Sequence, residues 1–301
     1  MAEIPRLPPE RVYLPYEAGP WRMAMGLTAA DPAELCEIDA TYPAQMAERR
    51  RLLDDRRDAV LAAPTGTEAA CAELLEVITD LLPRRFPDYF TLSDQRLDNL
   101  LTGETWDIGA APDPLDIIGR LVPEDFCLIR PTADGPLLIA AILCFPSRWV
   151  LAEKLGRPLQ DVHERVPGYA ARLGAPVDRF FANLKPGRMA LRLNWTIIDD
   201  PALFQLSGKF GTAPDLAITS DNALEKLFLR VERQTFVALP HSGNVSFGIR
   251  THVTPLARII IGAEEATRLA AAVRGLPADM ARYKSLGRFR EPLLAALDCA
   301  R

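Results

Sequence analysis

Five apolar segments of strand length, interrupted by one block of short helical segments, limit the folds open to this chain more than any other feature. Two of them precede the helical block and three follow it. In 189–197 and 245–253, apolar and more polar residues alternate, as in strands that bury one face. Asp134-Gly135 lies between the first two and predicts a hairpin turn. The predicted strands are 126–130, 137–145, 189–197, 227–239 and 245–253. We therefore expect an α+β fold with a five-stranded antiparallel sheet.

Helical periodicity and proline positions place helices before, between and after these strands. We predict helices at roughly 44–62, 67–82, 148–156, 158–165 and 175–184, and Ala- and Leu-rich helices within 263–300. The short middle helices should cover one face of the sheet, and the C-terminal helices should pack with the N-terminal ones around it. This succession of elements is also the layout of PAS domains. We divide the chain into an N-terminal lead with helices packing on the core (1–110), a PAS-like core (111–257) and C-terminal helices (258–301).

Charge and hydropathy exclude several classes of partner. A net charge of −5 and a pI near 5.4 provide no general attraction for nucleic acid. The longest strongly apolar run, 137–145, is too short to span a bilayer, and the N-terminus lacks the pattern of a signal peptide. We therefore expect a soluble, cytoplasmic protein that binds neither nucleic acid nor membrane.

The five cysteines lie far apart, and none forms a CxxC pair. This pattern predicts neither a zinc site nor a cysteine-held iron–sulfur cluster, and the odd count argues against a disulfide framework. Redox chemistry on this chain would need a cofactor that is held in another way.

Arginines crowd the first predicted helix. They are Arg49, Arg50, Arg51, Arg56 and Arg57. One interpretation is a solvated helix face with intrahelical ion pairs to Glu48, Asp54 and Asp55. The other is a docking face for an acidic electron-transfer partner.

Only three histidines are available to hold a cofactor: His163, His241 and His252. If Pro158 begins a helix, His163 shares an apolar face with Leu159, Val162 and Val166. A buried imidazole needs a partner, and two remain open: a backbone carbonyl in the core, or iron, since neutral imidazole is a common proximal ligand of heme. We expect His241 in the turn between the last two strands and His252 facing solvent from a strand.

Several motifs between about residue 16 and residue 256 resemble those of the heme-dependent oxidative N-demethylase family and occur in the expected order. The helical signature runs from Lys154-Leu-Gly156 through Pro158-Leu159 and Val162-His163 to Val166-Pro167-Gly168-Tyr169. Further matches are Gly19-Pro20-Trp21-Arg22-Met23, Met25-Gly26-Leu27, Ile38-Asp39 with Tyr42, Arg192-Leu-Asn194-Trp195, Glu232-Arg233-Gln234-Thr235 with Leu239-Pro240, and Ser242-Gly243 leading to Phe247-Gly-Ile249-Arg250-Thr251.

The resemblance implies that residues 111–257 are a PAS-like domain that binds heme b, with His163 as the proximal iron ligand. The implied activity is the oxygen-dependent removal of a methyl group from a small secondary amine such as dimethylamine, with release of formaldehyde. Electrons would come from NADPH through FMN and an iron–sulfur cluster. Because this chain has no cysteine cluster and no Gly-rich dinucleotide fingerprint, those groups are expected on reductase or ferredoxin-like partner subunits.

Polar residues on the predicted strands are candidates for the remaining roles. Glu232, Arg233 and Gln234 could hold an ammonium and polarise bound oxygen, although alternation puts Arg233 on the face opposite to the other two. The alternative for each is a surface or interface ion pair.

Two arginines and one tyrosine are candidates for holding the cofactor. Arg192 and Arg250 could bind heme propionates, but exposed arginines would show the same pattern. Tyr169 is a pocket candidate that could equally serve packing.

Three functions follow from these patterns. The first is a heme-dependent oxidative N-demethylase subunit. The second is a heme-PAS sensor of oxygen or another gas, although no output domain is evident in the sequence. The third is a structural α+β scaffold in which His163 belongs to the core.

Overall fold

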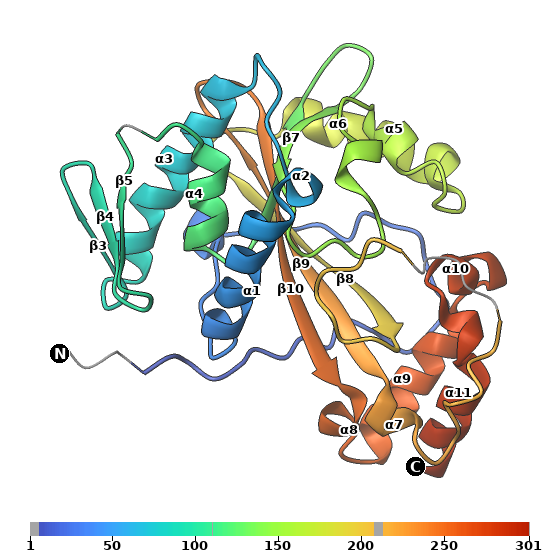
Figure 1. The fold of residues 1–301 in the computed structure, drawn as a ribbon. Coiled ribbons are helices and arrows are strands. Elements are labelled where there is room, and N and C mark those ends of the chain that lie inside the picture. The colour runs from blue at the N-terminus through green and yellow to red at the C-terminus, as the bar shows by residue number, and fades with distance from the viewer. Residues whose placement is uncertain (1–5, 110, 208–212, 301) are drawn as a thin grey trace.

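The computed structural model describes residues 6–109, 111–207 and 213–300, and a large antiparallel sheet runs through its centre (Figure 1). Within these residues the sheet has seven strands in the order β1-β8-β9-β10-β6-β7-β2. The strands are β1 (Thr28–Ala30), β2 (Leu61–Ala62), β6 (Asp125–Arg130), β7 (Leu137–Ile142), β8 (Met189–Ile198), β9 (Phe228–Ala238) and β10 (Val245–Pro255). The longest strands, β9 and β10, pair along their whole lengths in the middle of the sheet.

The α+β class is confirmed, but the prediction of five strands is wrong. The five predicted strands are the adjacent strands β8, β9, β10, β6 and β7, and the N-terminal part of the chain adds one short strand at each edge. Strands of three and two residues are too short to show a period of two. Short edge strands also limit pairing with other chains. The PAS-like assignment of this larger sheet remains a prediction.

A second, three-stranded antiparallel sheet was not predicted. It consists of β3 (Phe90–Ser93), β4 (Arg96–Asn99) and β5 (Glu104–Asp107). Its strands have four residues each and mostly polar sequences, and only a few of their side chains are buried. Such segments carry little of the apolar alternation by which strands are recognised.

The α-helices agree with most of the predicted segments, but the helix predicted over 148–156 is wrong, because only a short 3-10 helix, Leu151–Glu153, forms there. The α-helices are α1 (Tyr42–Asp55), α2 (Arg57–Val60), α3 (Glu68–Arg85), α4 (Pro114–Leu121), α5 (Leu159–Val162), α6 (Ala175–Asn183), α7 (Ala223–Lys226), α8 (Leu256–Ile259), α9 (Ala263–Gly275), α10 (Ala278–Tyr283) and α11 (Arg290–Cys299). The helix predicted over 158–165 is shorter than expected, since regular helix ends at Val162. No helix in the described ranges has both the length and the apolar character needed to cross a membrane.

Helices cover both faces of the sheet, as the alternation along β6 shows. Phe126 and Leu128 lie in a buried cluster with α1, α3 and α4, whereas Cys127 and Ile129 lie in a second cluster with residues of α5 and α6. Successive strand residues point to opposite faces, so these two clusters are separated by the sheet. Figure 1 shows the two helical groups on either side of the strands.

The C-terminal helices form a third core and do not pack with the N-terminal helices as predicted. Leu269, Val273 and Leu293 cluster with Leu229 and Val231 at one end of β9, separately from the core around α1 and α3. Thr196 Oγ1 of β8 donates a hydrogen bond to the Lys284 carbonyl oxygen at 3.2 Å. The C-terminal region therefore covers β8 beyond the three positions that pair with β1.

The arginine cluster of α1 does not form one solvated face. Arg49 is fully buried and donates to Asp125 Oδ1 at 2.6 Å, which ties α1 to the start of β6. Among the described residues, Arg51 alone of these arginines makes the predicted intrahelical pairs, with Glu48 at 2.7 Å and with Asp55 at 3.8 Å. The interpretation as a solvated helix face is therefore wrong for Arg49, which is fully buried and pairs with a residue 76 positions away in the sequence.

Candidate functional site

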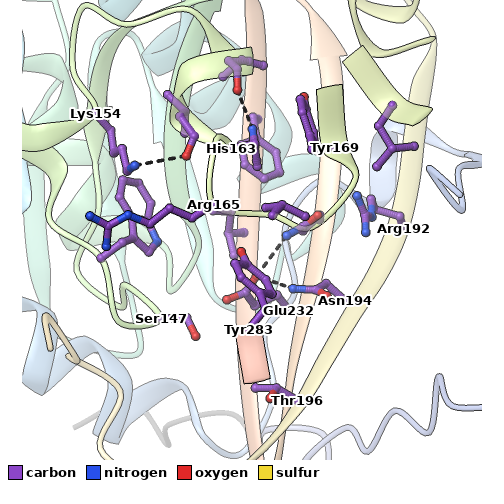
Figure 2. Close-up of a pocket in the computed structure, with 18 of the residues that line it drawn as sticks. Ser147, Lys154, His163, Arg165, Tyr169, Arg192, Asn194, Thr196, Glu232 and Tyr283 are labelled. Atoms are coloured by element: carbon purple, nitrogen blue, oxygen red, sulfur yellow. Dashed lines mark hydrogen bonds between the residues drawn. The ribbon is translucent and has the colours of Figure 1, made fainter. Parts of the chain in front are cut away.

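A cavity of about 1010 Å³ lies between the sheet and the segment that carries α5 and α6. Its volume is at the upper end of the range of about 300–1,000 Å³ that is typical of small-molecule and cofactor sites. The predicted site residues His163, Tyr169, Arg192, Glu232 and Gln234 all line it. Figure 2 shows His163 and Tyr169 on one side of this space, with Glu232 and Asn194 on the strands across from them.

His163 enters the cavity from the turn that ends α5. Its Nδ1 lies 2.8 Å from the Leu159 carbonyl oxygen, one helical turn earlier. A carbonyl only accepts hydrogen bonds, so Nδ1 carries the proton, and the lone pair of the neutral ring is on Nε2. This is the arrangement that orients a histidine for metal binding. Leu159, Val162 and Val166 line the same cavity, which confirms the predicted shared face.

Tyr169 packs flat against His163. The ring centroids are 4.6 Å apart, and the ring planes differ by 12°. Burial, followed by the negative charge of Asp178, raises the pKa of Tyr169 to about 12, so its hydroxyl keeps its proton at neutral pH. The stacked pair gives the imidazole a fixed orientation.

One part of the cavity wall is apolar and aromatic. Phe236 and Phe247 stack with their centroids 4.8 Å apart and their planes within 8°, and Phe180 and Phe181 meet Phe236 edge-on. Such a wall offers a dry surface to a large flat ligand.

The adjoining part of the same sheet face is polar and comes from β8 and β9. Strand register places Arg192 beside Gln234 and Asn194 beside Glu232. Glu232 Oε2 accepts hydrogen bonds from Gln234 Nε2 at 3.0 Å and from Asn194 Nδ2 at 3.3 Å. These amides fix the direction of the carboxylate, whose side chain is 14% exposed.

Arg192 is half-buried, and one nitrogen of its guanidinium, Nε, is buried without a hydrogen-bond partner among the described residues. Burial lowers the pKa of Arg192, and the negative charge of Glu232 offsets only part of that effect. A partly buried guanidinium of this kind favours an anionic ligand.

The C-terminal region supplies wall residues that the sequence did not point to. Tyr283 and Lys284, at the end of α10, line the cavity beside Asn194. Burial, followed by the charge of Glu232, raises the pKa of Tyr283 to about 12. Their position in the cavity wall could not be predicted, because the sequence of α10 is that of an ordinary amphipathic helix.

Arg233 and Arg250 do not lie in the cavity. They point to the opposite face of the sheet, where Arg233 Nε lies 3.3 Å from Glu37 Oε1 and Arg250 Nη2 lies 3.3 Å from Asp39 Oδ1. The predicted alternation, with Glu232 and Gln234 on one face and Arg233 on the other, is confirmed. Both arginines hold the segment before α1 against the sheet, at a distance from the cavity side of the strands.

His252 belongs to the same buried network, so its predicted solvent-facing position is wrong. Its Nε2 lies 3.2 Å from Glu37 Oε2, and its ring meets Tyr13 edge-on at 5.1 Å. Burial lowers the pKa of His252, although the hydrogen bond to Glu37 opposes this shift. The N-terminal segment covers this face of β10, which a strand pattern alone does not reveal. His241 lies in the predicted turn.

A family model described as haem-dependent oxidative N-demethylase, alpha subunit-like, matches residues 26–294. The chain belongs to this family. The match spans all the cavity residues named above, including Tyr283 and Lys284 near its end. The family is named for heme dependence and oxidative N-demethylation, and the term alpha subunit implies that other subunits exist.

The cavity residues fit the heme that this N-demethylase family requires. No group of three or more His, Cys, Asp or Glu side chains in the described residues could hold a bare metal ion. Iron in a porphyrin needs only one axial protein ligand, and His163 provides an imidazole with the required tautomer. The aromatic wall suits the ring, and Arg192 suits a propionate.

Proposed function

We propose that this chain is the heme b-binding subunit of an oxygen-dependent oxidative N-demethylase that acts on a small secondary amine. The observation that carries the proposal is the position of His163, held by Leu159 and Tyr169 at the wall of a cavity that is large enough for a macrocycle. Arg192 would bind a propionate, and Tyr169 would keep the imidazole plane fixed. The heme would supply the activation of oxygen.

The polar wall supports an amine substrate. Glu232 is a carboxylate held in place by two amide donors, and it can bind an ammonium group by a charge-assisted hydrogen bond. Gln234 can donate to a polar atom beside that amine. Arg233 faces away from the cavity, where its ion pair with Glu37 would stabilise the fold. A sensor of a neutral diatomic gas has no use for a carboxylate at this position, so Glu232 favours catalysis.

The balanced reaction needs partners. A secondary methylamine, one oxygen molecule, two electrons and two protons give a primary amine, formaldehyde and water. In the described residues, four of the five cysteines are buried and all are free, which leaves an iron–sulfur cluster to another chain. We propose that NADPH, FMN and an iron–sulfur cluster reside on reductase or ferredoxin-like subunits. Dimethylamine is the simplest substrate to test.

The test is reconstitution of the purified chain with hemin. We expect a Soret band in the wild type, its loss or a large shift in His163→Ala, and no change in His241→Ala, which removes an exposed histidine from a turn. We further expect formaldehyde when an amine, oxygen and a reducing system are added. An unchanged Soret band in His163→Ala would refute the assignment of the iron ligand.

A further inference from the structure

A continuous polar chain crosses the cavity wall from a cation to a carboxylate. Lys284 Nζ lies 3.5 Å from Asn194 Oδ1, and Asn194 Nδ2 lies 3.3 Å from Glu232 Oε2. All three residues line the cavity. The amide of Asn194 therefore accepts at its Lys284 end and donates at its Glu232 end.

Asn194 shows which kind of ligand suits this arrangement. Glu232 accepts a hydrogen bond from its amide and Lys284 donates one to it, over a distance that one short side chain spans. A molecule with an ammonium at one end and a carboxylate at the other offers the same donor and acceptor, with full charges that strengthen both hydrogen bonds.

The fold fixes the position of Lys284. Ser285, which follows it, has a φ of 59°, in the left-handed region that residues with a side chain rarely adopt. This turn ends α10 and brings Lys284 against β8, where Nζ donates to the Trp195 carbonyl oxygen and lies 5.4 Å from the centroid of the indole ring. The ammonium is thereby held at the cavity wall beside Asn194.

The charges around Glu232 favour a ligand without net charge. Arg230 Nε lies 4.0 Å from Glu232 Oε1, and the charge of Glu232 also acts on Arg192. A single carboxylate therefore faces the positive charges of two arginines. A simple alkylammonium would add a further positive charge. A zwitterion would add none, and its carboxylate would lie beside Lys284.

We propose that Glu232 and Lys284 together bind a secondary amine that also carries a carboxylate, of the N-methyl amino acid class. Glu232 binds its ammonium, Lys284 binds its carboxylate, and Asn194 positions both side chains. This inference rests on the proposed N-demethylase function, of which it names the substrate class.

The experiment compares N-methylglycine with dimethylamine by isothermal titration calorimetry on the hemin-loaded full chain. We expect N-methylglycine to bind at least about 10-fold more tightly, since its carboxylate adds a charge-assisted hydrogen bond to Lys284. Lys284→Met should remove this preference and change the dissociation constant of dimethylamine by less than about 2-fold. Lys284→Arg should retain the preference, and Lys185→Met, at an exposed lysine outside the cavity, should behave as the wild type.

Two results overturn the inference: equal binding of both amines by the wild type, or equal weakening of both by Lys284→Met in a protein that melts as the wild type does. If Lys284→Met does not fold, loss of the preference in Lys284→Arg overturns the proposal instead. Formaldehyde from dimethylamine without binding of N-methylglycine refutes only the substrate class. Selective binding of N-methylglycine without a Soret band or formaldehyde refutes only the N-demethylase function.

Discussion

Replacing Arg250 by Met should destabilise the fold and leave the cofactor site intact. Arg250 is fully buried, and its guanidinium donates to Thr41 Oγ1 at 2.9 Å, to Asp39 Oδ1 at 3.3 Å and to Gln45 Oε1. Methionine fills a similar volume but leaves Asp39 buried without its cation. Removing one partner of a buried ion pair costs about 3–5 kcal/mol.

That loss is a large part of the roughly 5–15 kcal/mol that stabilises a typical native domain. In a protein of this size, each kcal/mol of lost stability lowers the melting temperature by about 2–4 °C. We therefore expect the melting temperature to fall by roughly 10 °C. Differential scanning calorimetry measures this change, and the Soret absorbance per folded molecule at 20 °C measures heme binding. Arg188→Met, at an exposed arginine, is the matched control.

The two readouts separate a structural arginine from one that binds a propionate. Arg250→Met should lower the melting temperature and retain the Soret band of the folded protein. A variant that melts within about 2 °C of the wild type but no longer binds hemin would refute this reasoning, because it would indicate that Arg250 binds the cofactor.

Three further substitutions test the charges on the two faces of the sheet. Arg192→Met should weaken hemin retention by about 10-fold or more, measured by transfer of hemin to an apo-globin acceptor, with little change in the melting temperature. Glu232→Gln should weaken amine binding by about 10-fold or more in calorimetry and leave the Soret band in place; loss of the band would make Glu232 a structural residue. Burial raises the pKa of Glu124 to about 7, so the folded state holds a proton that the unfolded state releases near pH 4.5, and stability is lost as the pH rises through 7. Glu124→Gln should therefore remove roughly 2–3 kcal/mol of the fall in unfolding free energy between pH 5 and 8, measured by urea titration; equal pH dependence in both proteins would contradict the raised pKa.

The long strands could be predicted because burial of one face leaves a repeating pattern in the sequence. The alternation in 245–253 and the strand-length segment 227–239 predicted β10 and β9 to within a few residues, and the face shared by Leu159 and His163 indicated the cavity wall. These features depend on local periodicity, which one sequence contains.

The positions of the arginines could not be predicted in the same way. Alternation placed Arg233 on the face opposite to Glu232, but it did not show that the segment around Glu37 covers that face. Whether a polar strand residue meets solvent or a distant ion partner depends on tertiary packing, here between positions about 200 apart in the sequence. Lys284 was missed for the same reason, because the turn at Ser285 that brings it to Asn194 leaves no periodic signal.

The alternation along β9 makes this strand a boundary between two charge environments. Glu232 and Gln234 face the cavity, while Arg233 between them is paired with Glu37 on the other side. Deleting one residue from the middle of β9 would exchange the two sets, placing a guanidinium where the amine should bind and carboxylates against one another behind the sheet. A deletion or insertion of one residue in β9 therefore exchanges the charges on the two faces of the sheet, whereas a change of two residues keeps them in place.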